Sequence, residues 1–169
     1  MNIVFNRIID SQLTKFFVKT ELKTLEPEKS LVICNNQNKF DYDDWFEEYY
    51  SFLIKNKNGF MINLISDKVY YVGHIGIKEQ NPVNEAEIYI EIFKRYHGIK
   101  IGESSLNRFL NEYCIKHMNL RLINLKVIES NIIAINLYNK FKFAHNGISG
   151  KHWNGEKFEN VIKMSKVLQ

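Results

Sequence analysis

Residues 86–110, AEIYIEIFKRYHGIKIGESSLNRFL, contain the change of periodicity that decides the fold. Three isoleucines at the start of this stretch alternate with polar and aromatic residues, a spacing typical of a half-buried strand. A turn with two glycines follows at residues 97–102, and from Ile101 the apolar residues recur at helical spacing. The stretch therefore predicts a strand, a basic glycine-bearing turn and a helix in direct succession.

Such a turn is a candidate binding site for an anion. The first N–H groups of a helix have no partner within the helix, and the helix dipole favours negative charge there. The spacing alone is ambiguous, because glycines between a strand and a helix also relieve backbone strain. The common nucleotide-binding patterns do not fit, since there is no Gly-x-x-x-x-Gly-Lys-Ser/Thr run and Gly98 and Gly102 do not form Gly-x-Gly-x-x-Gly.

Length and composition favour a single folded domain over residues 1–169, because 45% of the residues are hydrophobic and only two are proline. The net charge of +4 is small and evenly spread, so we expect no nucleic-acid partner and a mild preference for an anionic small molecule. No apolar run is long enough for a membrane span, and no signal-peptide layout is visible. Cys34 and Cys114 lack metal-ligand spacing, so we expect no metal and a cytoplasmic location.

The rest of the chain predicts an alternation of strands and helices. In the first half we expect a strand at 2–8, a helix after Asp10 that buries Leu13, Phe16 and Phe17, a brief strand at 30–34, a helix at 41–56 capped by Asp41, and hairpin strands at 60–65 and 69–77. The strand and helix of residues 86–117 follow. We then expect a strand at 120–127, a helix at 130–141 capped by Ser130, a strand from 141, a glycine-rich loop at 147–155 and a strand at 158–167. Strands that alternate with helices in the second half indicate a mixed sheet with helices packed on it.

Two motifs and this order resemble the GNAT superfamily of acetyl-CoA-dependent N-acetyltransferases, from about residue 73 to the end and more loosely before it. The family pattern Asn-x-x-Ala-Ile-x-Leu-Tyr-x-Lys-x-Gly-Phe is matched by NIIAINLYNKFKF at 131–143, which departs only at Lys142. The ending WNGEKFENVIKM is similar to the ribosomal-protein, spermidine and nucleotide-amino-sugar acetyltransferase branches. The resemblance implies an α/β (α+β) GNAT fold: a mixed central sheet of about six to seven strands, helices on both faces, and a splay between the two central parallel strands.

The resemblance also implies where coenzyme A binds. The family's pyrophosphate motif, Arg/Gln-x-x-Gly-x-Gly/Ala, falls on His97, Gly98, Ile99, Lys100, Ile101 and Gly102, with His97 in place of Arg or Gln and Lys100 in place of the middle Gly. A lysine charge near a phosphate would partly compensate for that glycine, and the alternative is that Lys100 is a solvated surface residue. Ile90 and Ile92 would meet the pantetheine arm through their backbone. Asn131 would either contact coenzyme A or cap the helix that follows.

For catalysis, the family's tyrosine corresponds to Tyr138, which would protonate the departing thiolate. The alternative is an aromatic side chain that packs on the buried face of its helix. A base is needed if the amine arrives protonated, and we rank Glu87 ahead of Glu91 because Glu87 lies near the start of the strand, below the expected thioester. Either could be a solvent-facing residue instead, and His74 on the neighbouring strand is more typical of a buried core histidine.

The function implied is transfer of the acetyl group of acetyl-CoA to a primary amine of a small molecule by direct attack. Lys151, His152 and Trp153 could hold a phosphate and stack on a base or sugar, so a nucleotide-linked amino sugar is the first expected acceptor. A mobile polar loop explains the same three residues equally well. Acetylation of a polyamine or a protein N-terminus, and a non-catalytic acyl-CoA-binding module, are the alternatives; a homodimer is left open, and no membrane partner is expected.

Overall fold

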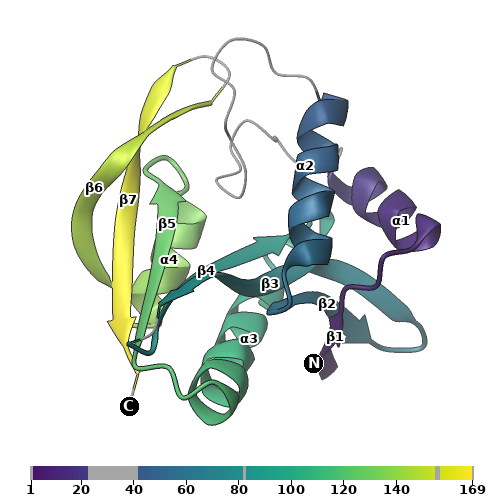
Figure 1. Cartoon of the computed structure of the whole chain (residues 1–169), viewed down its shortest axis with the longest axis horizontal. Helices are drawn as coiled ribbons and strands as arrows, with labels where there is room; N and C mark the ends of the chain where they lie inside the picture. Colours follow the sequence, from purple (N-terminus) through teal and green to yellow (C-terminus); the bar gives the residue numbers. More distant parts are fainter. Residues whose placement is uncertain (1, 23–41, 82, 155–156, 169) are drawn as a thin grey trace.

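The computed structural model describes residues 2–22, 42–81, 83–154 and 157–168. In chain order the elements are β1 (Asn2–Arg7), α1 (Gln12–Leu22), α2 (Tyr42–Lys55), β2 (Gly59–Ile65), β3 (Val69–Asn81), β4 (Glu85–Ile92), α3 (Ile101–Arg108), β5 (Leu122–Ile128), α4 (Ile132–Lys140), β6 (Ala144–Trp153) and β7 (Phe158–Val167) (Figure 1). A 3-10 turn (Lys94–Tyr96) precedes α3, and a π-helix (Phe109–His117) continues it. This order confirms the predicted alternation of strands and helices.

The strands of the described residues form one seven-stranded sheet in the order β1-β2-β3-β4-β5-β7-β6. Every neighbouring pair is antiparallel except β4 and β5, which run parallel in the middle. The parallel pair is short, because it joins only Glu85 to Leu122, Ala86 to Ile123 and Glu87 to Asn124. Beyond that point β4 and β5 diverge (Figure 1), which confirms the predicted mixed sheet with a central splay.

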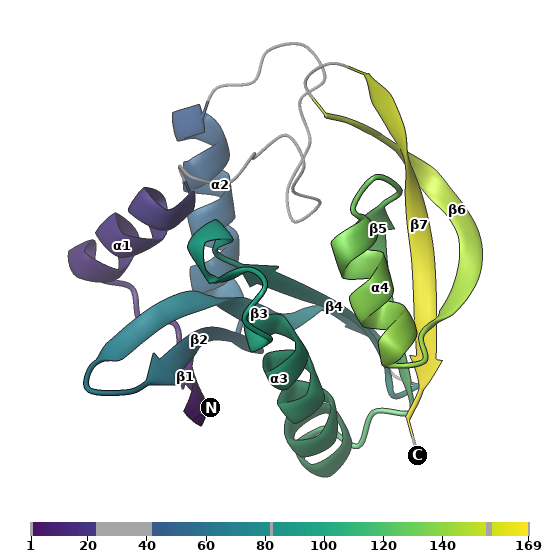
Figure 2. The same cartoon turned by 180° about the vertical axis from the view of Figure 1, so that it is seen from behind.

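Helices cover both faces of the sheet around β4. Helices α1 and α2 lie on one face and α3 and α4 on the other (Figures 1 and 2). Ile88, Ile90 and Ile92 pack in the core that includes α3 and Tyr138 of α4, whereas Tyr89 and Phe93 pack in the core under α2. The alternation was correctly assigned, but β4 is covered on both faces rather than half exposed.

Helix α1 differs in two respects from the prediction. Its first turn is capped by Ser11 rather than Asp10, because the Thr14 N–H donates to Ser11 Oγ at 3.1 Å. Val18 and Leu22 are buried against α2, and this orientation leaves Phe16 and Phe17 65% and 40% exposed, so the prediction that these two are buried is wrong. The side chain of Leu13, the cap Asp41 and the brief strand at 30–34 lie outside the described residues.

The C-terminal third also corrects the sequence-based assignment. Helix α4 is capped by Asn131, whose Oδ1 accepts a hydrogen bond from the Ala134 N–H at 3.1 Å, and not by Ser130. The next strand begins at Ala144 rather than 141, because Lys142 takes a left-handed φ of +61° that ends the helix. The predicted glycine-rich loop is wrong: residues up to Trp153 form β6, which pairs with β7 through two irregularities in register.

Candidate active site

The splay leaves one edge of β4 without a partner strand. Pairing with β5 ends at Glu87, while pairing with β3 continues to Ile92. The backbone N–H and C=O groups of β4 that face β5 beyond Glu87 therefore need another partner, since buried backbone polar groups are nearly always paired. An extended chain with amide groups, such as a pantetheine arm, fits such an edge.

The turn after β4 presents an open helix N-terminus. Lys100 is the N-cap of α3, has a left-handed φ of +63° and provides no side-chain cap. Its carbonyl accepts the first helical hydrogen bond, from the Ser104 N–H at 3.0 Å, so the N–H groups of the first turn remain for an anion. Gly98 has a φ of +79°, which favours glycine. A side chain at Gly102 would begin 3.5 Å from Ile92 and 3.6 Å from Leu137.

The side chains of the turn have different roles. His97 donates from Nε2 to the Ile92 carbonyl at 2.7 Å, and this bond ties the turn back to the end of β4. Ile101 is fully buried in the core, and Ile99 is half exposed. Lys100 is exposed and is the cation at the helix start. The predicted pyrophosphate residues thus form one continuous turn, in which backbone and Lys100 face solvent.

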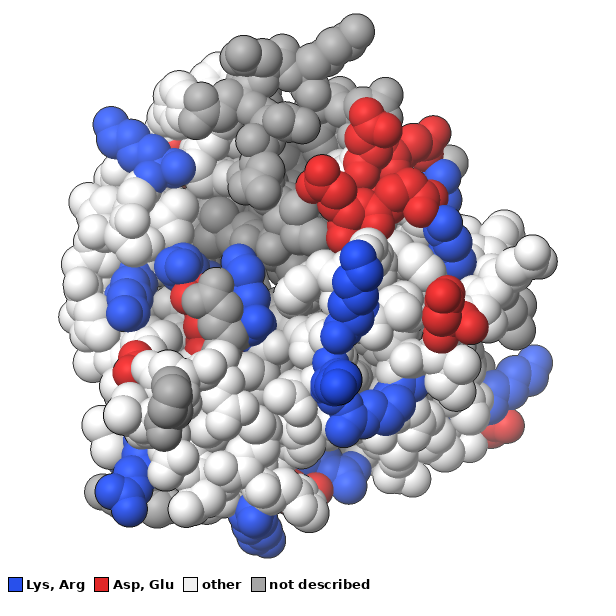
Figure 3. Space-filling model, in the orientation of Figure 1, with Lys and Arg blue, Asp and Glu red and all other residues white. Residues whose placement is uncertain are grey.

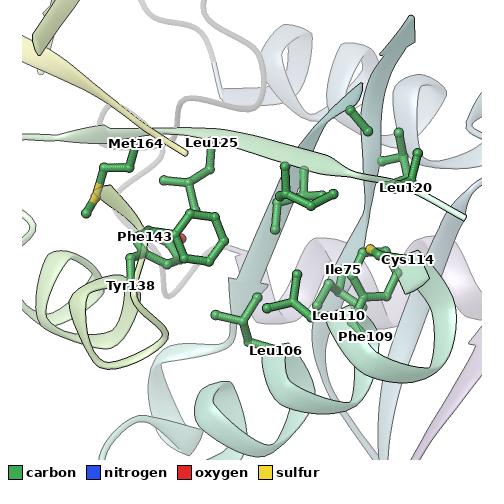
Figure 4. Packing of buried hydrophobic residues seen from close by; sticks show 14 of the residues in the cluster. Ile75, Leu106, Phe109, Leu110, Cys114, Leu120, Leu125, Tyr138, Phe143 and Met164 are labelled. Carbon is green, nitrogen blue, oxygen red and sulfur yellow. The ribbon is translucent and has the colours of Figure 1, made fainter. Parts of the chain in front are cut away.

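Tyr138 lies on α4, 6% exposed, with its ring 5.7 Å from that of Phe143 (Figure 4). Figure 4 also shows Leu125 of β5 next to this pair, so α4 holds Tyr138 against the strand that parts from β4. Burial, and after it the charge of Glu91, raise the pKa of the Tyr138 phenol above its ordinary value. The phenol therefore keeps its proton at neutral pH, as a proton donor must.

Glu91 lies on β4 and points to the α2 face. Burial raises the pKa of its carboxyl from 4.5 to about 7. Its charge also contributes to the raised pKa of both Tyr49 of α2 and Tyr138 of α4, so the carboxylate lies near both phenols. Its neighbour across the ladder is His74 of β3, and a side chain at Gly73 would overlap the Glu91 carbonyl. A carboxyl that titrates near neutrality beside a protonated phenol is suited to acid–base chemistry.

Comparison with known proteins identifies the family. Residues 22–143 match the sequence model of the Acetyltransferase (GNAT) family. This chain belongs to the GNAT acetyltransferase family. It is accordingly an acyltransferase that depends on acetyl-CoA. A search of curated proteins found no match.

Solved structures share the fold of this GNAT protein along nearly its whole length. A spermidine N-acetyltransferase from Vibrio cholerae in complex with CoA and spermine has a TM-score of 0.74 at 19% identity, covering 98% of this chain and 95% of that one. A dodecameric form of spermidine N-acetyltransferase from the same organism has a TM-score of 0.71 at 18% identity, covering 98% and 93%. None of the helices in the described part of this chain is long and apolar enough to span a membrane.

Glu87, which we ranked first as the base from the sequence, has different neighbours from Glu91 in the structure. Its side chain is 14% exposed, and its two oxygens lie 2.9 Å from Lys126 Nζ and 3.9 Å from Lys78 Nζ. Two ammonium groups, one from β3 and one from β5, thus engage this carboxylate. Glu91, by contrast, lies beside the two tyrosines.

His74 and Tyr49 form a buried pair behind Glu91. The Tyr49 hydroxyl lies 3.4 Å from Nδ1 of His74, and both residues are fully buried. Burial lowers the pKa of His74 to about 3, so the ring is neutral at neutral pH and cannot collect a proton there. Sequence reasoning missed Tyr49, because its helical spacing marks it only as one aromatic of the apolar face of α2.

The three residues proposed for substrate recognition lie on β6, two strands away from β5. Lys151 is exposed, His152 is buried, and Trp153 packs edge-on against Phe158 with ring centroids 5.1 Å apart. Their register opposite Asn160, Glu159 and Phe158 makes them part of a hairpin rather than a free loop. Asn131, the remaining candidate, uses its side-chain oxygen to cap α4.

Proposed function

We propose that this GNAT enzyme acetylates a primary amine of a small molecule by direct attack on acetyl-CoA, with a polyamine as the acceptor. The observation that carries the proposal is the Glu91 carboxyl, which has a pKa of about 7 and lies near the protonated phenol of Tyr138. A base near the splay can remove the proton of an amine that arrives charged, and an acid beside it can protonate the thiolate that leaves. We therefore assign the base to Glu91 in preference to Glu87.

The reaction follows from these groups. Ionised Glu91 accepts a proton from the acceptor ammonium, and the free amine attacks the thioester carbon. A C–N bond forms and the C–S bond breaks, while N–H groups on the open edge of β4 stabilise the negative charge on the thioester oxygen. Tyr138 donates its proton to the thiolate. The proton on the new amide nitrogen then returns to the Tyr138 phenolate, and Glu91 releases its proton to solvent.

Two observations favour a polyamine over the nucleotide-linked amino sugar. Both solved structures described above are spermidine N-acetyltransferases. Helix α2, which carries Tyr49 beside Glu91, also has four acidic residues in its first two turns, Asp43, Asp44, Glu47 and Glu48. Acidic side chains gather over these turns in Figure 3. The amino-sugar reading rested on Lys151, His152 and Trp153, which are in a strand at the far side of the sheet. We also propose that the enzyme associates with a second copy of this chain as a homodimer.

The acceptor is tested by measuring CoA release with a panel of amines. We expect spermidine to stimulate CoA release from acetyl-CoA and to be recovered as its acetylated product, with a nucleotide-linked amino sugar and a peptide N-terminus well behind it. Turnover with the amino sugar or the peptide alone would overturn the polyamine assignment and leave the acetyltransferase intact. Tight CoA binding with no stimulation by any amine would support the non-catalytic acyl-CoA-binding module instead.

For the phosphate-binding turn, we predict that Lys100→Glu weakens acetyl-CoA binding, most strongly at low salt. The substitution reverses an exposed charge at the start of α3, and exposed charges are screened as ionic strength rises. Calorimetric titration at two salt concentrations measures the effect. Lys100→Gly is the matched control, because glycine tolerates the left-handed φ and removes the charge without reversing it, so its loss of affinity should be smaller. Equal affinity in all three proteins would make Lys100 a plain surface residue.

A further inference from the structure

The point at which β4 and β5 part is crossed by a chain of ion pairs. Glu87, paired in register with Asn124, is the last residue of β4 that pairs with β5. Its carboxylate lies 2.9 Å from Lys126 Nζ and 3.9 Å from Lys78 Nζ. Basic side chains crowd around acidic ones on this face of the sheet (Figure 3). One carboxylate thus links β3, β4 and β5.

The placement of the two lysines is specific to this point. The register between β3 and β4 shifts between Ile77 and Glu79, so Lys78 is the extra residue of a bulge, and bulges commonly redirect a side chain. Lys126 follows Asn124 by two residues and therefore shares its face, on a part of β5 that has already left β4. The Glu87–Lys126 ion pair consequently spans the gap just beyond the last backbone contact.

A second carboxylate secures the other side of the same contact. Glu85 accepts hydrogen bonds from the side-chain amides of Asn124 and, at 2.9 Å, Asn81. These bonds, and after them the charge of Lys163, lower the pKa of Glu85. Side chains therefore hold the short parallel segment of β4 at both of its ends: Glu85 at the first paired residue, and Glu87 at the last, where β4 and β5 begin to part.

We propose that Glu87, with Lys78 and Lys126, sets the angle at which β4 and β5 part, and that this angle positions the acyl group. Glu91 is carried by β4, and Tyr138 is carried by α4, which directly follows β5. The distance between the base Glu91 and the acid Tyr138 therefore depends on the angle at which β4 and β5 part. The acyl end of acetyl-CoA then points toward Glu87, where β4 and β5 part, because the phosphates of acetyl-CoA bind beyond the other end of β4. This inference rests on the proposed function, and it makes Glu87 a positioning residue rather than the base.

The test compares Lys126→Met, which keeps the length of the side chain and loses the charge, with Lys126→Arg, which keeps both. We expect Lys126→Met and Glu87→Gln to lower kcat/KM for acetyl-CoA by between about 5- and 10²-fold. The lower limit is the usual contribution of an ion pair near the surface, and the upper limit is the usual cost of misplaced reacting groups. Both variants should also lose preference for acetyl-CoA over butyryl-CoA. Lys126→Arg should stay close to the wild type.

Two readouts separate this inference from the proposed function. The pH dependence of kcat/KM should keep its inflection near 7 in Glu87→Gln, because Glu91 is untouched; loss of that inflection would make Glu87 the base and overturn the inference. Calorimetric binding of acetyl-CoA and butyryl-CoA needs no turnover, so it applies even if no amine is acetylated. Unchanged binding and unchanged acyl preference in Glu87→Gln and Lys126→Met would overturn the inference on their own.

Discussion

Glu91→Gln is expected to lower kcat/KM for the amine by about 10²–10⁴-fold at pH 7, the usual contribution of a general base. The wild-type rate should rise with pH through about 7, where Glu91 ionises, and then level off. The variant has no base, so its rate should follow the fraction of free amine and rise up to an amine pKa of about 10.4. The gap between the two proteins should therefore narrow steadily above pH 7. A pH–rate profile measures this directly.

The stability of the same variant serves as its control. Burial raises the folded-state pKa of Glu91 above the ordinary 4.5, so the ionised carboxyl disfavours the folded state. The wild type should lose stability relative to Glu91→Gln as pH rises from about 4.5 through about 7, and the two should converge in acid. A slower variant that melts no earlier than the wild type has lost chemistry, not structure. An equal loss of rate at every pH would assign Glu91 to substrate positioning.

Tyr138→Phe is expected to lower kcat by about 10²–10⁴-fold while leaving acetyl-CoA affinity nearly unchanged. The substitution removes one hydroxyl and keeps the ring that packs against Phe143. A proton that moves only as the thiolate leaves contributes to the transition state and not to the bound ground state, so its loss appears in kcat. Steady-state kinetics and calorimetric binding on one preparation measure the two quantities.

The competing role for Tyr138 is packing alone. A purely structural aromatic predicts a lower melting temperature with turnover intact. Full activity in Tyr138→Phe would remove the proton donor from the account. Loss of both activity and acetyl-CoA binding would instead indicate that α4 no longer packs against β5.

Much of the fold was predictable because the deciding signals are local. The change from alternating to helical spacing between β4 and α3 is a property of neighbouring residues, and it located the turn that the structure places at the start of α3. The motif around Tyr138 was equally local. The continuation of β6 beyond residue 146 was missed, because glycines in a strand with irregular register resemble a loop when the partner strand is unknown.

The choice between Glu87 and Glu91 was not predictable, because partners on other strands decide it. Both carboxylates lie on the same face of β4 and have similar neighbours in sequence. The ammonium groups that engage Glu87 come from β3 and β5, and the buried surroundings of Glu91 include Tyr49 of α2. Periodicity assigns a residue to a face of the sheet, but the charge environment on that face depends on tertiary packing.

A rapid-mixing experiment tests the central claim, which is direct acetyl transfer from acetyl-CoA to a polyamine at Glu91 and Tyr138. Enzyme in excess over acetyl-CoA is mixed with spermidine, and free thiol and acetylated amine are followed by absorbance and mass spectrometry. We predict that both products appear together, one for one, at a single rate that rises with pH through about 7. Thiol release that precedes the acetylated amine, or that is independent of spermidine, would contradict direct attack and the roles assigned to these two residues.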